Sequence, residues 1–186
     1  MTPDRGSPCT GEKRDGTRRS IFLVGFMGAG KTSVGRALSR HLGWDFADLD
    51  QWIEATAGRT ITEIFEASGE PVFRKIEHTA LRNLCDQLLG EPKVIALGGG
   101  AFVQPKNVAL IEGVAAHTVF LDAPPEELLR RCRLQPQARP LCSDVVRFRQ
   151  LYEARKPGYL GAARRIETQG KEIEAVAMEV ACVLGV

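Results

Sequence analysis

The sequence predicts an α/β fold in which a parallel β-sheet is covered by helices on both faces. Short, continuous apolar runs recur along the chain, as strands buried on both faces require, and longer segments of helical character separate them. The chain has 186 residues, which suits one compact domain with its own core and is too short for two ordinary domains. A single α/β domain is therefore the expected architecture.

The strands are predicted where apolar residues run together. The first run extends from Ile21 to Val24, and the clearest later runs read VIAL and TVFL. Two further segments are weaker because their apolar runs are shorter. The candidate strands are residues 20–25, 45–47, 94–97, 118–121 and 165–168.

Helices are predicted between these strands. Residues 33–42 place Val34, Leu38 and Leu42 on one face. Residues 125–133 open with a proline and two glutamates, which suit the first turn and the positive end of a helix dipole. Strands that alternate with helices in this way indicate a parallel sheet.

Composition excludes several classes of function. The chain carries 25 Lys and Arg residues against 23 Asp and Glu residues, so a broad nucleic-acid-binding surface is not expected. The sequence has no apolar run as long as a membrane span, and its cysteines lack metal-ligand spacing. Residues 1–19 are polar and rich in turn formers, which predicts a disordered leader before a domain at residues 20–186. We expect a cytoplasmic protein that binds neither nucleic acid nor membranes.

The most informative motif is GFMGAGKT at residues 25–32, which matches GxxxxGK[ST] and lies between the first predicted strand and the first predicted helix. In such a loop, backbone N–H groups cradle phosphates, a lysine bridges the β- and γ-phosphates, and a hydroxyl can bind Mg²⁺. The motif predicts nucleotide binding but does not separate kinases from other nucleotide-dependent proteins. The expected nucleotide contacts here are Gly28, Ala29, Gly30, Lys31, Thr32 and Ser33.

Asp48 and Asp50 follow the second predicted strand. If the chain stays extended, alternation places both carboxylates on the same side, facing the ligand crevice at the carboxyl edge of the sheet. One could then serve a Mg²⁺ site while the other orients or deprotonates an acceptor hydroxyl. The alternative is that the pair only caps a helix.

Arg74 and Glu77 are three residues apart in a segment, residues 69–77, that is predicted to begin a helix. Their side chains form either a solvated ion pair or a site where the guanidinium grips a substrate carboxylate. In the second case, Glu77 holds the arginine or accepts a substrate hydroxyl. Gly98, Gly99 and Gly100 follow the VIAL strand and form either a tight loop or a close backbone approach to a ligand.

Basic residues gather in the second half of the chain. A charged connection after the helix at residues 125–133 is either a solvated loop or a mobile lid that brings an arginine to the transferring phosphate. Arg155 precedes Pro157, where a helix is predicted to end, and is a second candidate for a substrate anion. The basic residues of the connection and its helix are Arg130, Arg131, Arg133 and Arg139.

Assembled in order, these segments resemble the shikimate kinase family over residues 21–185. The resemblance rests on an ordered set of motifs, GFMGAGKT, DLDQWIEATAGRTITEIFEASGEPVFRKIE, LGGGA, RPL and RKPGY. It implies a P-loop, nucleoside-monophosphate-kinase-like fold, which is a three-layer α/β/α sandwich with a five-stranded parallel sheet. It also implies a substrate-binding segment at about residues 48–77 and a lid at about residues 134–143.

The activity that the resemblance implies is phosphorylation of the shikimate 3-hydroxyl in aromatic amino acid biosynthesis, with ATP as co-substrate and Mg²⁺ as cofactor, by a monomer. Lys31 would contact the ATP phosphates, Thr32 and Asp48 would serve Mg²⁺, and Asp50 would be the base. Catalytic roles would fall to Asp50, Lys31 and the lid residue Arg139, and Arg131 would lie against the adenine. Shikimate would be bound by Asp50, Arg74, Glu77, Gly98, Gly99, Gly100 and Arg155.

The chain departs from the family pattern at LGAARR after Tyr159, in a slightly longer lid that contains Pro136, and in the 19-residue leader, which the common pattern lacks. The sequence leaves two other functions open. One is a related small-molecule kinase for gluconate or a nucleoside monophosphate, which the motif set fits less well. The other is a non-catalytic nucleotide-binding module, which would not need an acceptor-side carboxylate such as Asp50.

Overall fold

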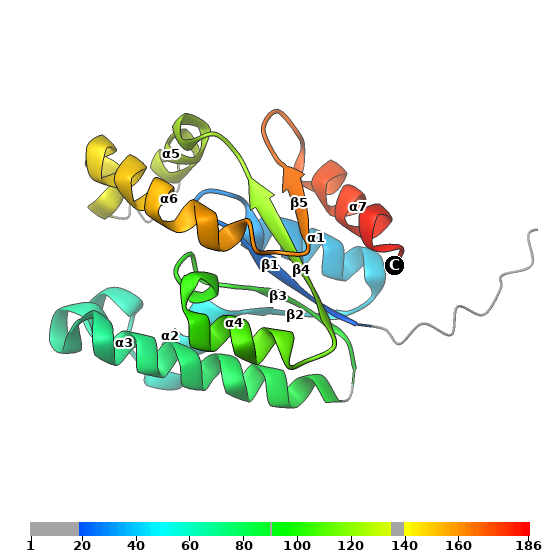
Figure 1. The fold of residues 1–186 in the computed structure, drawn as a ribbon, viewed down its shortest axis with the longest axis horizontal. Coiled ribbons are helices and arrows are strands. Elements are labelled where there is room, and N and C mark those ends of the chain that lie inside the picture. The colour runs from blue at the N-terminus through cyan, green and yellow to red at the C-terminus, as the bar shows by residue number, and fades with distance from the viewer. Residues whose placement is uncertain (1–18, 90, 135–139) are drawn as a thin grey trace, which may run out of the picture.

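The computed structural model describes residues 19–89, 91–134 and 140–186 (Figure 1). The expected leader, apart from Arg19, lies outside these residues, as do residues 135–139 of the expected lid, which include Arg139. Among the described residues, every helix is too short or too polar to cross a membrane.

The centre of the molecule is a five-stranded sheet in the order β2-β3-β1-β4-β5, and each pairing in it is parallel. β1 forms because its apolar run is buried on both faces, with Ile21 to Val24 fully enclosed. The predicted strands are therefore confirmed, with small shifts at their ends. Their bounds are β1 (Ser20–Val24), β2 (Asp45–Asp48), β3 (Lys93–Ala96), β4 (Ala116–Asp122) and β5 (Arg164–Glu167).

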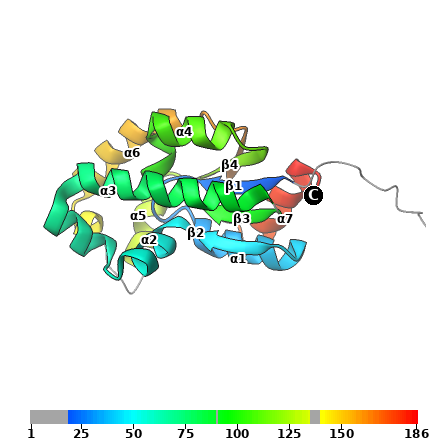
Figure 2. The same ribbon diagram turned by 90° about the horizontal axis from the view of Figure 1, so that it is seen from below.

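Helices cover both faces of this sheet and complete the predicted three-layer sandwich (Figure 2). α1 and α7 pack together on one face, and α4 and α6 lie on the opposite face. Short 3₁₀ turns connect some elements, among them η2 (Ala101–Val103) after β3. The helices are α1 (Lys31–Leu42), α2 (Leu49–Ala57), α3 (Ile61–Asp86), α4 (Pro105–Glu112), α5 (Pro125–Arg133), α6 (Val145–Tyr159) and α7 (Ile173–Leu184).

α3 is interrupted at Gly69, whose φ of 72° and ψ of 172° are not helical. Helix restarts immediately afterwards, and Pro71 fits its first turn because the missing N–H there has no helical partner to lose. The prediction that a helix begins within residues 69–77 is confirmed for this second half. The first half is an additional helical segment, which Thr60 and Glu63 start with a reciprocal capping box.

The expected end of a helix at Pro157 is wrong, because α6 continues through the proline to Tyr159. Pro157 cannot donate to the carbonyl of Glu153 one turn earlier and crowds it, so other contacts must offset this cost. The final turn is held by Tyr159, which is fully buried, lies 5.3 Å from the ring of Phe120 and donates its hydroxyl to the carbonyl of Gly99. This helix thereby reaches the glycine-rich turn after β3.

Candidate active site

The site forms where the carboxyl ends of the parallel strands meet. The phosphate loop follows β1, Asp48 ends β2, and the glycine-rich turn follows β3. In parallel α/β sheets this edge is the usual place for a ligand, because side chains and helix N-termini from neighbouring strands converge there. The topology therefore brings segments that are far apart in the sequence to one crevice.

The phosphate loop owes its shape to glycines with positive φ, at Gly25 (143°), Gly28 (81°) and Gly30 (90°). Gly28 is also required by space, since a Cβ there would lie 2.5 Å from the carbonyl oxygen of Leu128 in α5. At the start of α1, the Lys31 ammonium donates to the carbonyls of Gly25 at 2.9 Å and Phe26 at 3.0 Å. The lysine is thus folded over the loop, beside the helix N-terminus.

Asp48 joins the phosphate loop to α2. Its Oδ2 accepts a hydrogen bond from the Thr32 hydroxyl at 2.6 Å, and its Oδ1 accepts from the backbone N–H groups of Asp50 and Gln51. The expected alternation of Asp48 and Asp50 is wrong, because the chain does not stay extended: α2 begins at Leu49. The helix-capping alternative holds for Asp48, which caps α2 and contacts Thr32 with the same carboxylate.

Asp50 reaches the crevice from the first turn of α2 rather than from an extended strand. Its Oδ1 faces Gly98 so closely that a Cβ on Gly98 would overlap it. The same Cβ position lies 3.5 Å from Oε1 of Glu77. Two carboxylates, one from α2 and one from α3, therefore converge on the glycine-rich turn.

Arg74 is held by carboxylates on both of its edges. Its Nη1 donates to Oε1 and Oε2 of Glu77 at 3.0 and 2.8 Å, while Nε and Nη2 donate to Oε1 of Glu70 at 3.1 and 2.9 Å. The side chain of Glu77 is 1% exposed and that of Arg74 is 17% exposed, so this pair is not a solvated surface ion pair. Sequence reasoning missed Glu70, although its i,i+4 spacing to Arg74 is a signal that could have found it.

Burial and the ion pair act in opposite directions on the pKa values of Glu77 and Arg74. Burial raises the pKa of Glu77, against the opposing effect of the Arg74 guanidinium, and the nearby Asp50 carboxylate adds to the rise. For Arg74, burial works to lower the pKa, but the carboxylates of Glu77 and Glu70 outweigh it and raise the pKa. Arg74 therefore stays positively charged beside Gly100.

The glycine-rich turn separates the two halves of the site. A Cβ on Gly100 would lie 2.6 Å from both Nη1 and Nη2 of Arg74. A Cβ on Gly99 would lie 3.8 Å from Nη1 of Arg155 and 3.6 Å from the backbone nitrogen of Met27 in the phosphate loop. Phosphate loop, turn and both arginines are thus close neighbours.

α6 supplies Arg155 from the side opposite Arg74. Its guanidinium carbon lies 6.0 Å from the ring centroid of Phe26 in the phosphate loop, within range of a cation–π contact. Arg155 also interacts with the Tyr159 hydroxyl, although burial outweighs this contact and raises the pKa of Tyr159 to about 12. The tyrosine hydroxyl therefore stays protonated and donates a hydrogen bond to the carbonyl of Gly99.

Asn107 supports the turn from behind. It is 1% exposed, its Oδ1 pairs with Nδ1 of His78 at 2.7 Å, and its Nδ2 donates to the carbonyl of Ala101 at 3.0 Å. The residue therefore ties α3, one position after Glu77, to the residue after Gly100. Nothing in the local sequence around Asn107 signals this role, because His78 is 29 positions away in the chain.

Gly98→Ala is expected to lower turnover about tenfold or more while nucleotide affinity is retained, because the new methyl group displaces the Asp50 carboxylate. The φ of Gly98 is not in the left-handed region, so the effect does not come from backbone strain. Steady-state kinetics and ADP titration measure it. Gly113→Ala is the matched control, since its Cβ would make contacts of 3.4 Å or longer. Equal turnover in Gly98→Ala and the wild type would show that Asp50 can move away without loss.

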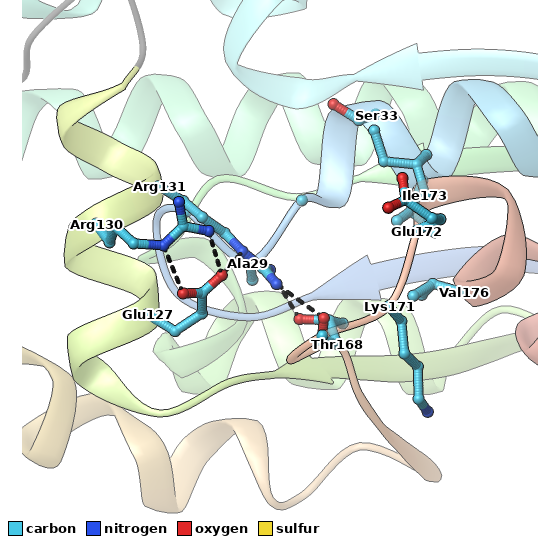
Figure 3. A pocket seen from close by; sticks show the side chains of 14 residues that line it. Ala29, Ser33, Glu127, Arg130, Arg131, Thr168, Lys171, Glu172, Ile173 and Val176 are labelled. Carbon is cyan, nitrogen blue, oxygen red and sulfur yellow. Dashed lines mark hydrogen bonds and ion pairs between the residues drawn. The ribbon is translucent and has the colours of Figure 1, made fainter.

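On the other side of the phosphate loop lies a cavity of about 390 Å³ (Figure 3). The predicted contacts Gly28, Ala29, Gly30, Ser33 and Arg131 all line it. Sequence reasoning missed the lining residues after β5, because only the topological rule for strand ends points to that loop. These residues include Thr168, Gly170, Lys171 and Glu172, and Glu127 of α5, which also lines the cavity, was missed as well.

A protein-family model described as Shikimate kinase matches residues 27–184. The chain belongs to the shikimate kinase family. It is 39% identical over 163 residues to a shikimate kinase of Thermus thermophilus, and the match covers 86% of each chain. It is 44% identical over 164 residues to a shikimate kinase of Caulobacter vibrioides, which covers 87% of this chain and 79% of that one.

Solved structures agree with this assignment. Shikimate kinase from Acinetobacter baumannii, solved in complex with shikimate, is 36% identical, has a TM-score of 0.81 and covers 91% of this chain and 94% of that chain. A gluconokinase from Sinorhizobium meliloti is 18% identical with a TM-score of 0.60, covers 90% of this chain and 92% of that one, and shows a likeness of fold alone. Membership of the shikimate kinase family, which uses ATP, decides against the gluconate and nucleoside monophosphate alternatives.

One departure from the shikimate kinase pattern has a local structural role. The LGAARR stretch after Tyr159 ends in Arg165. Its Nε donates to Oδ2 of Asp122 at 3.0 Å, and its Nη2 lies 2.7 Å from the same oxygen. Asp122 is buried at the end of β4 and also accepts the Tyr152 hydroxyl of α6. The LGAARR segment thereby helps hold β4, β5 and α6 together.

Proposed function

We propose that this protein transfers the γ-phosphoryl group of ATP to the 3-hydroxyl of shikimate, producing shikimate 3-phosphate and ADP in aromatic amino acid biosynthesis. One observation carries the proposal: the phosphate loop, the Asp50 carboxylate and the buried Arg74–Glu77 pair meet around the Gly98–Gly100 turn. In this arrangement a phosphate-binding loop lies beside a carboxylate and a guanidinium group. Such a site suits direct transfer of a phosphoryl group to a hydroxy acid.

The nucleotide side neutralises charge. Backbone N–H groups of the loop and the N-terminus of α1 bind the phosphates, and Lys31 exchanges its loop carbonyls for the β- and γ-phosphate oxygens. Both contacts favour the transition state because negative charge accumulates on the oxygens of the transferring group. Arg139 is proposed to add a further positive charge from the lid.

Thr32 and Asp48 fit a magnesium site. A hydroxyl oxygen and a carboxylate oxygen 2.6 Å apart, next to the phosphate loop, are the hard donors that Mg²⁺ prefers, directly or through its waters. When bound there, Mg²⁺ supplies charge neutralisation for the phosphates. The capping bonds that Asp48 accepts from α2 keep its carboxylate in this position.

The acceptor side positions the hydroxyl. Arg74 and Arg155 bind the shikimate carboxylate, Glu77 fixes Arg74, and the glycines of the turn let the ligand approach. Asp50 accepts the proton of the shikimate 3-hydroxyl while the oxygen of that hydroxyl bonds to the γ-phosphorus of ATP. The bond between the γ-phosphorus and the β–γ bridging oxygen breaks at the same time, and ADP leaves. The protein is proposed to act as a cytoplasmic monomer.

A substrate panel tests the proposed function. With ATP and Mg²⁺, ADP release is expected to depend on shikimate and not on gluconate or nucleoside monophosphates, because the chain belongs to the shikimate kinase family. A coupled ADP-release assay measures the rates. ADP release without an acceptor, at the same rate as with shikimate, would point to an ATPase instead, and the absence of ADP release with every acceptor would point to a binding module. Turnover with gluconate alone would contradict the substrate assignment.

A further inference from the structure

The guanidinium of Arg131 is fixed by the protein on the wall of the nucleotide-side cavity (Figure 3). Its Nε donates to Oε1 of Glu127 at 2.7 Å, its Nη1 donates to the Thr168 hydroxyl at 3.0 Å, and its Nη2 donates to the Thr168 carbonyl at 2.8 Å. Each of its three nitrogens is therefore engaged. A long side chain that would otherwise sample many rotamers has one position.

One end of this arrangement is rigid. Thr168 is 2% exposed, and its backbone N–H and its hydroxyl both donate to the carbonyl of Asp122, at 2.8 and 3.1 Å. Because its hydroxyl proton points to Asp122, the Thr168 oxygen presents a lone pair to Arg131. The end of β4 therefore fixes two of the three contacts of the guanidinium.

Glu127 provides the remaining contact, on the same helix as Arg131 and one turn before it. Its carboxylate is 15% exposed and also accepts two hydrogen bonds from Arg130, whose side chain is 62% exposed and extends toward solvent. Hydrogen bonds from Arg130, followed by those from Arg131, lower the pKa of Glu127 to about 2 despite the opposing effect of burial. The carboxylate is therefore ionised at neutral pH and holds Arg131 with a charge-assisted hydrogen bond.

We propose that Glu127 is a positioning residue for nucleotide binding, which fixes the Arg131 guanidinium as a preformed wall for the nucleoside part of ATP. The inference rests on the proposed function, because it takes the cavity beside the phosphate loop as the nucleotide site. Preorganisation matters here since a side chain immobilised during folding need not be immobilised by the ligand. Charge alone gives the opposite expectation: an acid near a polyphosphate repels it, so its removal would tighten binding.

The test compares two probes, ADP and inorganic tripolyphosphate, by calorimetric titration. Glu127→Gln is expected to weaken ADP binding about threefold to tenfold, which is the cost of immobilising one long side chain. Tripolyphosphate has no nucleoside, so its affinity should change less than about twofold. Glu127→Asp keeps the charge but withdraws the carboxylate by one methylene group, and it should weaken ADP binding in the same direction.

Arg131→Ala completes a double-mutant cycle. If Glu127 acts through Arg131, adding Glu127→Gln to Arg131→Ala should produce no further loss of ADP affinity. Glu126→Gln is the matched control, because Glu126 also lies in the first turn of α5 but is 64% exposed and pairs with Arg149. It should bind both probes as the wild type does.

The outcomes separate the two proposals. Unchanged or tighter ADP binding in Glu127→Gln, equal losses for ADP and tripolyphosphate, or additive losses in the double variant would overturn the positioning role. Wild-type behaviour of Glu127→Asp beside a weakened Glu127→Gln would show that a carboxylate in this turn suffices whatever its exact position, and would overturn the positioning role as well. Failure of the wild-type protein to bind ADP would instead contradict the nucleotide site and with it the proposed function.

Discussion

Replacement of Asp50 by asparagine is expected to lower kcat by roughly a hundredfold or more while nucleotide affinity stays close to that of the wild type. The amide has nearly the same shape as the carboxylate, so the contact with Gly98 survives, but it cannot accept the proton of the acceptor hydroxyl. Steady-state kinetics give kcat, and calorimetric titration with ADP gives the nucleotide affinity. Thermal unfolding of both proteins shows whether the fold is intact.

Asp45→Asn is the matched control for this substitution. Asp45 lies at the start of β2, its side chain is 74% exposed, and its partner is Lys93, away from the carboxyl edge of the sheet. We expect normal turnover from this variant. Normal turnover from Asp50→Asn as well would remove Asp50 as the base and leave positioning as the main source of catalysis.

Arg74→Ala is expected to raise the KM for shikimate about a hundredfold, because a bidentate charge-assisted contact with the substrate carboxylate is lost. The substitution also leaves the Glu77 carboxylate, 1% exposed, without its cation. Breaking a buried pair in this way costs about 3–5 kcal/mol of folding stability. Kinetics at saturating ATP, ADP titration and thermal unfolding measure the three quantities separately.

Arg74→Lys separates binding from folding. A lysine keeps a positive charge beside Glu77 and should preserve most of the stability, but it cannot form the bidentate fork, so the KM for shikimate should still rise about tenfold. Arg40→Ala, at an arginine that is 68% exposed, is the control for loss of an arginine elsewhere. A normal KM in Arg74→Lys, or equal loss of ADP and shikimate binding in Arg74→Ala, would contradict a specific role in holding the substrate.

Much of this fold follows from local sequence. The strands could be predicted because burial on both faces produces continuous apolar runs such as Ile21 to Val24, and the phosphate loop because glycines are required where φ is positive. The position of Asp50 could not be predicted in the same way. Alternation along a strand gave its expected direction, but the Asp48 cap starts α2 and carries Asp50 into a helical turn.

Contacts between segments that are distant in the sequence were harder to predict than the local features of the site. Glu70 and Glu127 stand one turn before Arg74 and Arg131, so helical spacing could have found them. Thr168 could not be found that way, because it meets Arg131 only after β5 has been placed beside β4. Similarly, the end of α6 depends on Tyr159 reaching Gly99, which outweighs the local preference of Pro157.

The contact between Arg74 and Glu70 changes what ligand entry involves at this pocket. The Nε and Nη2 edge of the guanidinium already faces the Glu70 carboxylate, so under the proposed function the substrate carboxylate would take the place of Glu70 instead of meeting a bare cation. The Glu70 side chain is 60% exposed, and ion pairs with such exposed groups are typically worth less than about 1 kcal/mol. This exchange should therefore cost little, because most of the desolvation of Arg74, which is 17% exposed, takes place during folding and a carboxylate lies beside this edge both before and after the ligand arrives.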